Sequence, residues 1–305
     1  MNHNIRQILA ATDLSPCSLQ AVDRGFQLAR ATAARYTVMS ALGLDALGPL
    51  KMLLGEKADD VTERAMAYQR AALDTVVRDP KHNLGVDADV VVEDGLAANV
   101  VPARAASVDA DLVVVGAKGE NPVRRFFIGS TASHLMRKSA CPVLVVKRPC
   151  HGAYHRALLP VDFSPASELA VRLVRNLAPT AQIVLLNVFD VPFEGVLQYA
   201  GVSEDEIHRY RAEARERAIR DLHALATKVG LSRDDYVPVV EHGNAAAHIL
   251  DNEKRAACDL IVMGKHGTHV TEELLLGSVT KHVLSESHGD VMVVVDKRTT
   301  GPSNG

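Results

Sequence analysis

Two glycine-rich segments contain the residue types that bind a charged ligand. Residues 116–131 read GAKGENPVRRFFIGST and residues 264–278 read GKHGTHVTEELLLGS. In both, a glycine follows an apolar run, a second glycine comes three residues later, and a Gly-Ser pair follows ten residues after that. Glycine lets main chain approach a ligand that a Cβ would push away. A helix start has unpaired N–H groups that attract an anion. The spacing therefore predicts a phosphate-binding loop in each half of the chain.

The same residues also have a purely structural interpretation. A glycine after a strand is often only a turn, and a serine at a helix start is often only a cap. The repetition favours the ligand-binding interpretation, because the glycines and the Gly-Ser pair recur while most residues between them differ.

The whole chain of 305 residues repeats once. Residues 148 positions apart agree, as do residues 149 positions apart near the start of each copy. The pairs include Gly95 and Gly243, Asp111 and Asp259, Gly116 and Gly264, Asp13 and Asp162, and Ser15 and Ser164. A repeat of this length predicts two tandem domains, 1–148 and 156–298, with 149–155 as the linker.

Short apolar runs alternate with amphipathic segments in each copy. In the first copy we expect strands in RQILAAT, YTVMSAL, VDADVVVED, ADLVVVG and CPVLVVK, and helices after DLSP, over about 58–79, over about 97–107 and from Ser130. In the second we expect strands in RALLPVD, QIVLLNVFD, YVPVVEHG, CDLIVMG and DVMVVVD. Runs such as DLVVVG do not alternate, which is typical of parallel strands buried on both faces. The predicted fold class is α/β: two tandem doubly wound (Rossmann-like, HUP-type) domains, each a five-stranded, mostly parallel sheet flanked by helices.

The fold predicts where the ligand lies. In open parallel sheets, ligands bind at the carboxyl ends of the strands. Gly116 ends the fourth predicted strand and Asp13 follows the first. We therefore expect these two residues to be close in space.

The G-x2-G-x9-G-[S/T] loop resembles the ATP-binding signature of the universal stress protein family. The first-strand Asp, the DLVVVG and DLIVMG strands and the ending ACPVLVVK carry the same resemblance, which covers nearly the whole chain. It implies ATP in each half, with Mg²⁺ bound through the phosphates. By position, the residues implied at adenosine are Ala11, Asp13, Ala41, Pro160, Asp162 and Val188. Those implied near the ribose are Val115, Gly116, Gly119, Met263, Gly264 and Gly267, and those implied at the phosphates are Gly129, Ser130, Thr131, Gly277, Ser278 and Val279.

The chain also departs from the family pattern. The second copy has SHGDVMVVVD where the family usually carries Cys-Pro before the last strand. In the first copy, Ala11 and Ala41 are smaller than the residues that the family usually carries at these positions. We therefore expect the first site to bind more weakly than the second.

The resemblance implies a nucleotide-dependent regulator or sensor of the stress response. Its two domains would pack through their fifth strands, two chains would pair as a homodimer, and unidentified protein partners would recognise the loaded state. Two alternatives stay open. One is slow ATP hydrolysis or autophosphorylation at Ser130 or Ser278, since no general base or magnesium cage is evident. The other is a nucleotide-free scaffold.

Composition argues against other classes of protein. The net charge is −3 and no basic block is present, so no nucleic-acid partner is expected. No apolar run approaches the ~18 residues of a membrane span. The start MNHNIRQILAATD lacks the layout of a signal peptide, and the four cysteines are scattered, so we expect a cytoplasmic protein.

Histidines and lysines in the glycine loops raise two smaller questions. His266, His269 and His282 lack the fixed spacing and carboxylate support of a metal centre, so no metal site is predicted. Lys118 and Lys265 either face solvent or lean toward a phosphate.

Overall fold

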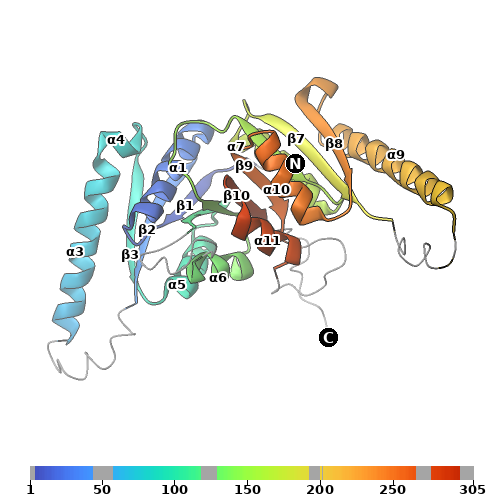
Figure 1. Cartoon of the computed structure of the whole chain (residues 1–305). Coiled ribbons are helices and arrows are strands. Elements are labelled where there is room, and N and C mark those ends of the chain that lie inside the picture. The colour runs from blue at the N-terminus through green and yellow to red at the C-terminus, as the bar shows by residue number, and fades with distance from the viewer. Residues whose placement is uncertain are drawn as a thin grey trace, which may run out of the picture.

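A single ten-stranded sheet runs through the computed structural model, which describes residues 4–43, 58–117, 129–191, 200, 202–265 and 276–295 (Figure 1). The strands of the first half are β1 (Gln7–Ala11), β2 (Arg35–Leu42), β3 (Ala88–Asp94), β4 (Leu112–Gly116) and β5 (Val143–Val146). Those of the second half are β6 (Arg156–Pro160), β7 (Gln182–Phe189), β8 (Tyr236–His242), β9 (Leu260–Gly264) and β10 (Asp290–Val294). The order across the sheet is β3-β2-β1-β4-β5-β10-β9-β6-β7-β8.

The two halves meet at their fifth strands. Neighbouring strands within each half are parallel, whereas β5 and β10 are antiparallel, with Leu144 opposite Met292. The expected α/β fold and the expected pairing of the fifth strands are therefore both confirmed. The two five-stranded halves form one continuous sheet.

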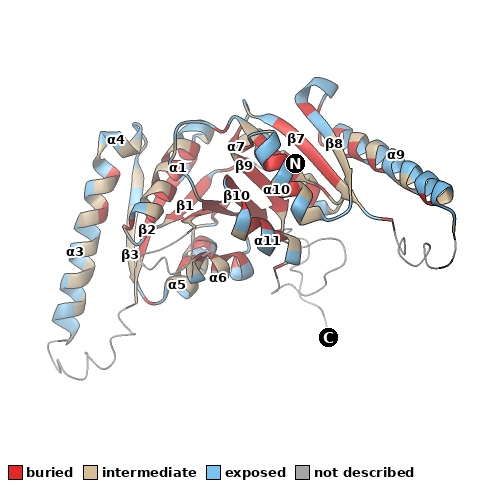
Figure 2. Cartoon of the chain, in the orientation of Figure 1, coloured by how far each residue is buried: buried red, intermediate tan, exposed pale blue. Residues whose placement is uncertain are grey.

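Helices cover both faces of the sheet, and one apolar cluster lies under each layer. The first layer holds α1 (Pro16–Thr32), α3 (Ala58–Arg78), α4 (Pro80–Asn83), α7 (Pro165–Leu177) and α9 (Glu204–Lys228). The second holds α5 (Ala97–Ser107), α6 (Ser130–Lys138), α10 (Ala245–Arg255) and α11 (Ser278–Glu286). A short 3₁₀ turn, Arg233–Asp235, precedes β8. Figure 2 shows the central strands as the buried middle of the molecule, which is why their sequences are apolar on both faces, whereas β3 and β8 at the two edges of the sheet are mostly half-buried or exposed.

One pair of repeated aspartates has a structural role at the starts of β1 and β6, at the opposite end of the strands from the glycine loops. Asp111 Oδ2 accepts hydrogen bonds from the backbone N–H groups of Arg6 (2.8 Å) and Gln7 (3.1 Å), at the start of β1. Asp259 accepts the equivalent bonds from His155 and Arg156 at the start of β6. The recurrence of this pair therefore reflects the anchoring of the first strand of each half.

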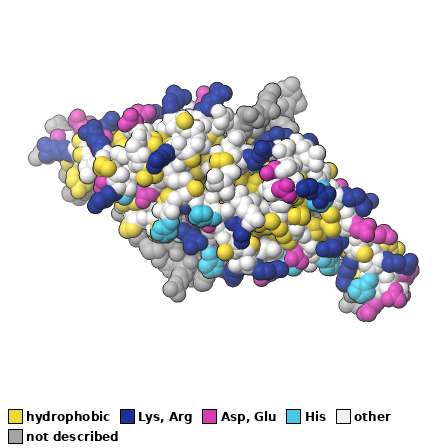
Figure 3. All heavy atoms as spheres, turned by 90° about the horizontal axis from the view of Figure 1, so that it is seen from above, with side chains coloured by type: hydrophobic (Ala, Val, Ile, Leu, Met, Phe, Trp, Pro, Cys, Tyr) yellow, Lys and Arg dark blue, Asp and Glu magenta, His cyan; other side chains and the backbone are white. Residues whose placement is uncertain are grey.

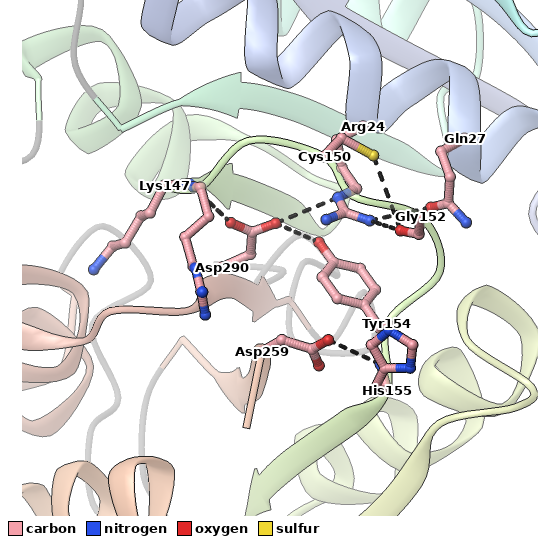
Figure 4. A network of polar contacts seen from close by, with 10 residues as sticks. Arg24, Gln27, Lys147, Cys150, Gly152, Tyr154, His155, Asp259 and Asp290 are labelled. Carbon is pink, nitrogen blue, oxygen red and sulfur yellow. Dashed lines mark hydrogen bonds and ion pairs between the residues drawn. The ribbon is translucent and has the colours of Figure 1, made fainter. Parts of the chain in front are cut away.

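A buried polar network fastens the joint between the halves (Figure 4). Asp290, which is 1% exposed, accepts hydrogen bonds from the backbone N–H of Lys147 (2.8 Å) and the hydroxyl of Tyr154 (2.7 Å). Its Oδ2 lies 3.4 Å from Nε of Arg24, whose guanidinium stacks 4.1 Å from the centre of the Tyr154 ring and donates to Gly152 O. Burial, and then the Asp290 carboxylate, raise the pKa of Tyr154 well above its usual value, so the phenol stays a donor.

Candidate functional site

The carboxyl ends of three strands meet in each half. In the first half, Ala11 on β1 is the ladder neighbour of Met39 on β2 and of Val115 on β4. Ala41 lies two residues beyond Met39 on β2, and Gly116 directly follows Val115. Of the sequence-predicted adenosine and ribose residues of this half, Ala11, Ala41, Val115 and Gly116 therefore lie on adjacent strands.

The second half has the same arrangement with a shorter ladder. Pro160 is opposite Leu186, two residues before Val188. The β1–β4 ladder has four residue pairs, but the β6–β9 ladder has only two, ending at Leu158 and Ile261. The N–H of Val161 donates to Leu186 O on β7, so alternation directs position 160 toward β9. Proline has no N–H to donate there, which explains the shorter ladder.

These predicted residues also share one face of the sheet. Val115 and Met263 belong to the apolar cluster under α5, α6, α10 and α11, and Ala11, Val188 and Val279 pack against it. Ala11 and Val188 are half-buried on this face, the face from which α6 and α11 pack.

Asp13 and Asp162 shape the turns that lead into α1 and α7. Oδ1 of Asp13 accepts the N–H of Ser15 at 3.0 Å, and Oδ1 of Asp162 accepts the N–H of Ser164 at 3.1 Å. Such Asx turns fix the backbone two residues on. The intervening residue adopts φ of 63° in both halves, a left-handed conformation that the turn imposes.

The two aspartate turns differ in their hydroxyl partners. In the second half, Asp162 Oδ1 also accepts the hydroxyls of Ser164 (2.6 Å) and Ser167 (2.8 Å). In the first half, the residue equivalent to Ser167 is Ser18, and its hydroxyl lies 2.8 Å from the Thr12 hydroxyl. Val161 replaces Thr12 in the second half and has no hydroxyl to compete. Three donors, the N–H of Ser164 and the hydroxyls of Ser164 and Ser167, therefore hold the Asp162 carboxylate through Oδ1.

Gly116 has a packing role that the sequence did not reveal. A Cβ at this position would lie 2.8 Å from the backbone oxygen of Cys17 and 3.1 Å from Cα of Ser18, both in the first turn of α1. The glycine therefore allows the helix to approach the end of β4. Gly119 and Gly267, the second glycines of the two loops, lie outside the described residues.

The helices that follow the loops begin without a side-chain cap. Gly129 is the N-cap of α6 and Gly277 that of α11, with φ of −54° and −57° and ψ of 150° in both. Any residue can adopt this conformation, so it does not itself require glycine. The starts of α1, α7, α9 and α10 are instead capped by the side chains of Ser15, Ser164, Ser203 and Asn244, while α5, like α6 and α11, has no such cap.

Each uncapped start is tied to the end of a central strand. The N–H of Gly129 donates to Ala117 O at 2.9 Å, directly after β4, and the N–H of Gly277 donates to Lys265 O at 3.0 Å, directly after β9. Ser130 and Ser278 follow as exposed first residues of their helices, and Thr131 and Val279 are half-buried second residues. The first-turn N–H groups of α6 and α11, with the positive ends of the helix dipoles, thus lie beside the strand ends.

Lys265 matches neither sequence-based alternative. It is only 6% exposed, and Nζ donates to the carbonyl oxygen of Arg137, in the C-terminal turn of α6, at 2.7 Å. Its partner therefore belongs to the other half of the chain. Lys118, His266 and His269 lie outside the described residues.

A separate cavity of about 700 Å³ lies between α9 and the carboxyl end of β7. Phe163, Asn187 and Phe189 line it together with one side of α9. Phe163 packs against the apolar cluster of the α1, α3, α7 and α9 layer, so this cavity is on the face opposite the uncapped helices.

Three further features of the chain concern metals, membranes and charge. Among the side chains placed by the structure, no group of three or more His, Cys, Asp or Glu could hold a metal ion. None of the helices in the described ranges has the length and apolar character needed to cross a bilayer. On the face in Figure 3, basic and acidic side chains are interspersed, in line with a net charge of −3.

Comparisons with known proteins point to one family. Residues 4–147 and 153–295 each match the family described as the Universal stress protein family. A universal stress protein of Mycolicibacterium smegmatis is 31% identical over 62% of this chain, and the match spans 63% of that protein, less than two thirds of its length.

A solved structure that aligns with nearly the whole chain shows the same fold. A universal stress protein from Archaeoglobus fulgidus covers 94% of this chain, and the alignment covers 97% of that protein, with 18% identity and a TM-score of 0.65. Another structure, of a universal stress protein in complex with cAMP, is 26% identical and aligns with 47% of this chain and 97% of its own, with a TM-score of 0.31.

Proposed function

The chain belongs to the universal stress protein family, and from this premise we propose that each half binds ATP and that the chain is a nucleotide-dependent regulator or sensor of the stress response. The proposal includes a cytoplasmic location, pairing of two chains and protein partners that recognise the loaded state. The alternatives are slow ATP hydrolysis and a nucleotide-free scaffold.

One observation carries the binding proposal. Gly129 and Gly277 start α6 and α11 without a side-chain cap, each tied by hydrogen bond to the end of the neighbouring central strand. The helix-start N–H groups and the dipole favour an anion there. The arrangement occurs in both halves, at the strand ends where a doubly wound sheet binds its ligands.

The proposed binding mode uses the residues already placed. The phosphates would bind at the starts of α6 and α11, near Ser130 and Ser278, with Mg²⁺ held through the phosphates. The adenosine would lie along the strand ends. Because Asp162 is held by three donors through Oδ1, it is oriented before a ligand arrives. The expectation that the second site binds more tightly stays part of the proposal.

The described residues favour binding over rapid turnover. Oδ1 of Asp13 and Oδ1 of Asp162 accept hydrogen bonds from their own turns, so these carboxylates act first as turn-forming groups. A general base must reach the attacking water directly or through one further water. We therefore expect any ATP hydrolysis to be slow.

Charge substitutions at the helix starts test the proposal. Ser130→Asp and Ser278→Asp place a carboxylate at exposed first helical positions, where the dipole favours it and folding is preserved. Two unit charges about 4 Å apart near a protein surface interact by about 4 kcal/mol, so the carboxylate should weaken phosphate binding more than tenfold. Ser130→Asn and Ser278→Asn are the uncharged controls of similar size.

Calorimetric titration of nucleotide-free full-length protein with ATP and Mg²⁺ gives the readout. We expect two bound nucleotides in the wild type and in the Asn variants, one in each single Asp variant, and none in the double Asp variant. Two nucleotides on the folded double Asp variant would refute the assignment of the phosphates to these helices. Parallel titrations with AMP and cAMP identify which adenine nucleotide is preferred.

A further inference from the structure

The C-terminal turns of the two uncapped helices are each held by a lysine of the opposite half. Lys265, in the second half, donates from Nζ to Arg137 O at the end of α6. Lys147, in the first half, donates from Nζ to Leu284 O (2.6 Å), Ser287 O (2.9 Å) and Ser287 Oγ (2.7 Å) at the end of α11. A cation at a helix C-terminus satisfies its last carbonyls and complements the dipole.

Each lysine is also attached to the wall of its own half's proposed site. Lys265 directly follows Gly264, the last residue of β9. Lys147 directly follows Val146, which is the ladder partner of Gly116 and accepts the N–H of Ala117 at 2.9 Å. Each proposed phosphate helix therefore has its N-terminus at one site and its C-terminus bonded to the strand ends of the other.

The two contacts were not inherited from the duplication. The position equivalent to Lys147 in the second half is Val295, and the position equivalent to Lys265 in the first half is Ala117. Two different positions therefore supply the same kind of contact. The Lys147 contact is further anchored by its backbone N–H, which donates to the buried Asp290 (Figure 4).

From this geometry we propose that the two nucleotide sites are coupled, with positive cooperativity transmitted by Lys265 and Lys147. The inference rests on the proposed nucleotide binding. α6 and α11 have nine residues each, so each is short enough to move as a unit. A phosphate that fixes the N-terminus of one helix also fixes the lysine at its C-terminus, and with it the strand end beside the other phosphate site. The second nucleotide then binds to a site that is already ordered.

The test first measures the ATP affinity of each site alone and then compares these affinities with the binding isotherm of the wild type. Titration of folded Ser278→Asp gives the affinity of the first site alone, and Ser130→Asp gives that of the second. If the sites are independent, these two constants predict the wild-type isotherm. We expect the wild type to bind the second ATP at least roughly fivefold more tightly than the single-site constants predict. A factor of five is the lower end of typical coupling between two sites.

Lysine variants then locate the coupling. Lys265→Met and Lys147→Met should each bind two ATP molecules with the isotherm expected for independent sites. The single-site constants for this comparison come from the same lysine variant combined in turn with Ser278→Asp and with Ser130→Asp. Lys138→Met is the matched control, because Lys138 lies in the same C-terminal turn of α6 but donates to Asn99 within its own half. It should retain the full cooperative factor. Thermal melting verifies that each variant is folded, and if Lys265→Met does not fold, Lys147→Met decides.

The outcomes distinguish this inference from the proposed function. If ATP binds neither site of the wild type, both proposals fail. If both sites bind ATP but the wild-type isotherm equals the independent sum, only the coupling is refuted. Cooperativity that survives in folded Lys147→Met and Lys265→Met also refutes it, because the lysines would then not transmit it.

Discussion

Replacing Gly116 with alanine should destabilise the protein even without nucleotide. The new Cβ would lie 2.8 Å from Cys17 O and 3.1 Å from Cα of Ser18. Both neighbours are backbone atoms, so no side-chain rotation relieves the contact and the first turn of α1 must shift by a few tenths of an ångström. Forcing extra volume into a packed site costs about 1–3 kcal/mol. We therefore expect the free energy of unfolding to fall by that amount in urea titrations of nucleotide-free protein.

Gly43→Ala is the control for this substitution. Its Cβ would meet only Leu96 Cδ2, at the ordinary contact distance of 3.5 Å. Alanine also restricts the unfolded chain, so Gly43→Ala should be neutral or more stable by up to about 1 kcal/mol. The packing argument is refuted if Gly116→Ala unfolds at the wild-type urea concentration. If that variant also no longer binds ATP, the glycine serves the ligand and not the helix.

Two further predictions concern a buried ion pair and a half-buried histidine. Asp290→Asn leaves the Arg24 guanidinium buried without its carboxylate, so the free energy of unfolding should fall by about 3–5 kcal/mol. Tyr154→Phe removes only one hydrogen bond to Asp290, so the fall should be about 1 kcal/mol. Equal losses for the two variants in urea titrations would contradict the ion-pair argument. Burial, and then Arg233, lower the pKa of His223 below its usual 6.5, so the unfolded chain binds the proton more readily. The contribution of His223 to stability should be complete above about pH 6.5 and lost as the pH falls through the folded pKa. His223→Gln should therefore flatten the dependence of the unfolding free energy on pH between 7 and 5, and an unchanged slope would contradict this assignment.

Most of the strands and helices could be predicted because their causes are local. Apolar runs such as DLVVVG become buried strands wherever helices cover both faces of the sheet. The helix predicted over about 97–107 is observed as Ala97–Ser107, and the one predicted from Ser130 begins there. The tandem repeat could also be predicted, because duplicated sequence leaves pairs at a fixed spacing.

The sequence could not show which neighbour Gly116, Lys265 or Asp111 serves. Gly116 fits both a ligand wall and a close helix approach, and only the position of α1 reveals the second role. The partner of Lys265 is on α6, 128 positions away, and depends on how the two halves join. Asp111 recurs with the glycines yet anchors the start of β1, at the opposite end of the strands.

The antiparallel β5–β10 pairing joins two related units. Because both units belong to a single polypeptide, they are always present in a one-to-one ratio. In an association of identical subunits, every substitution appears twice, so the two partners stay alike. Covalent fusion removes that constraint, and each unit is free to acquire its own solution to a shared problem. Here one unit has a proline where the other has alanine, and lysines at unrelated positions complete the same joint. The molecule is in this sense a permanently linked heterodimer, able to specialise one unit while the other keeps its original task.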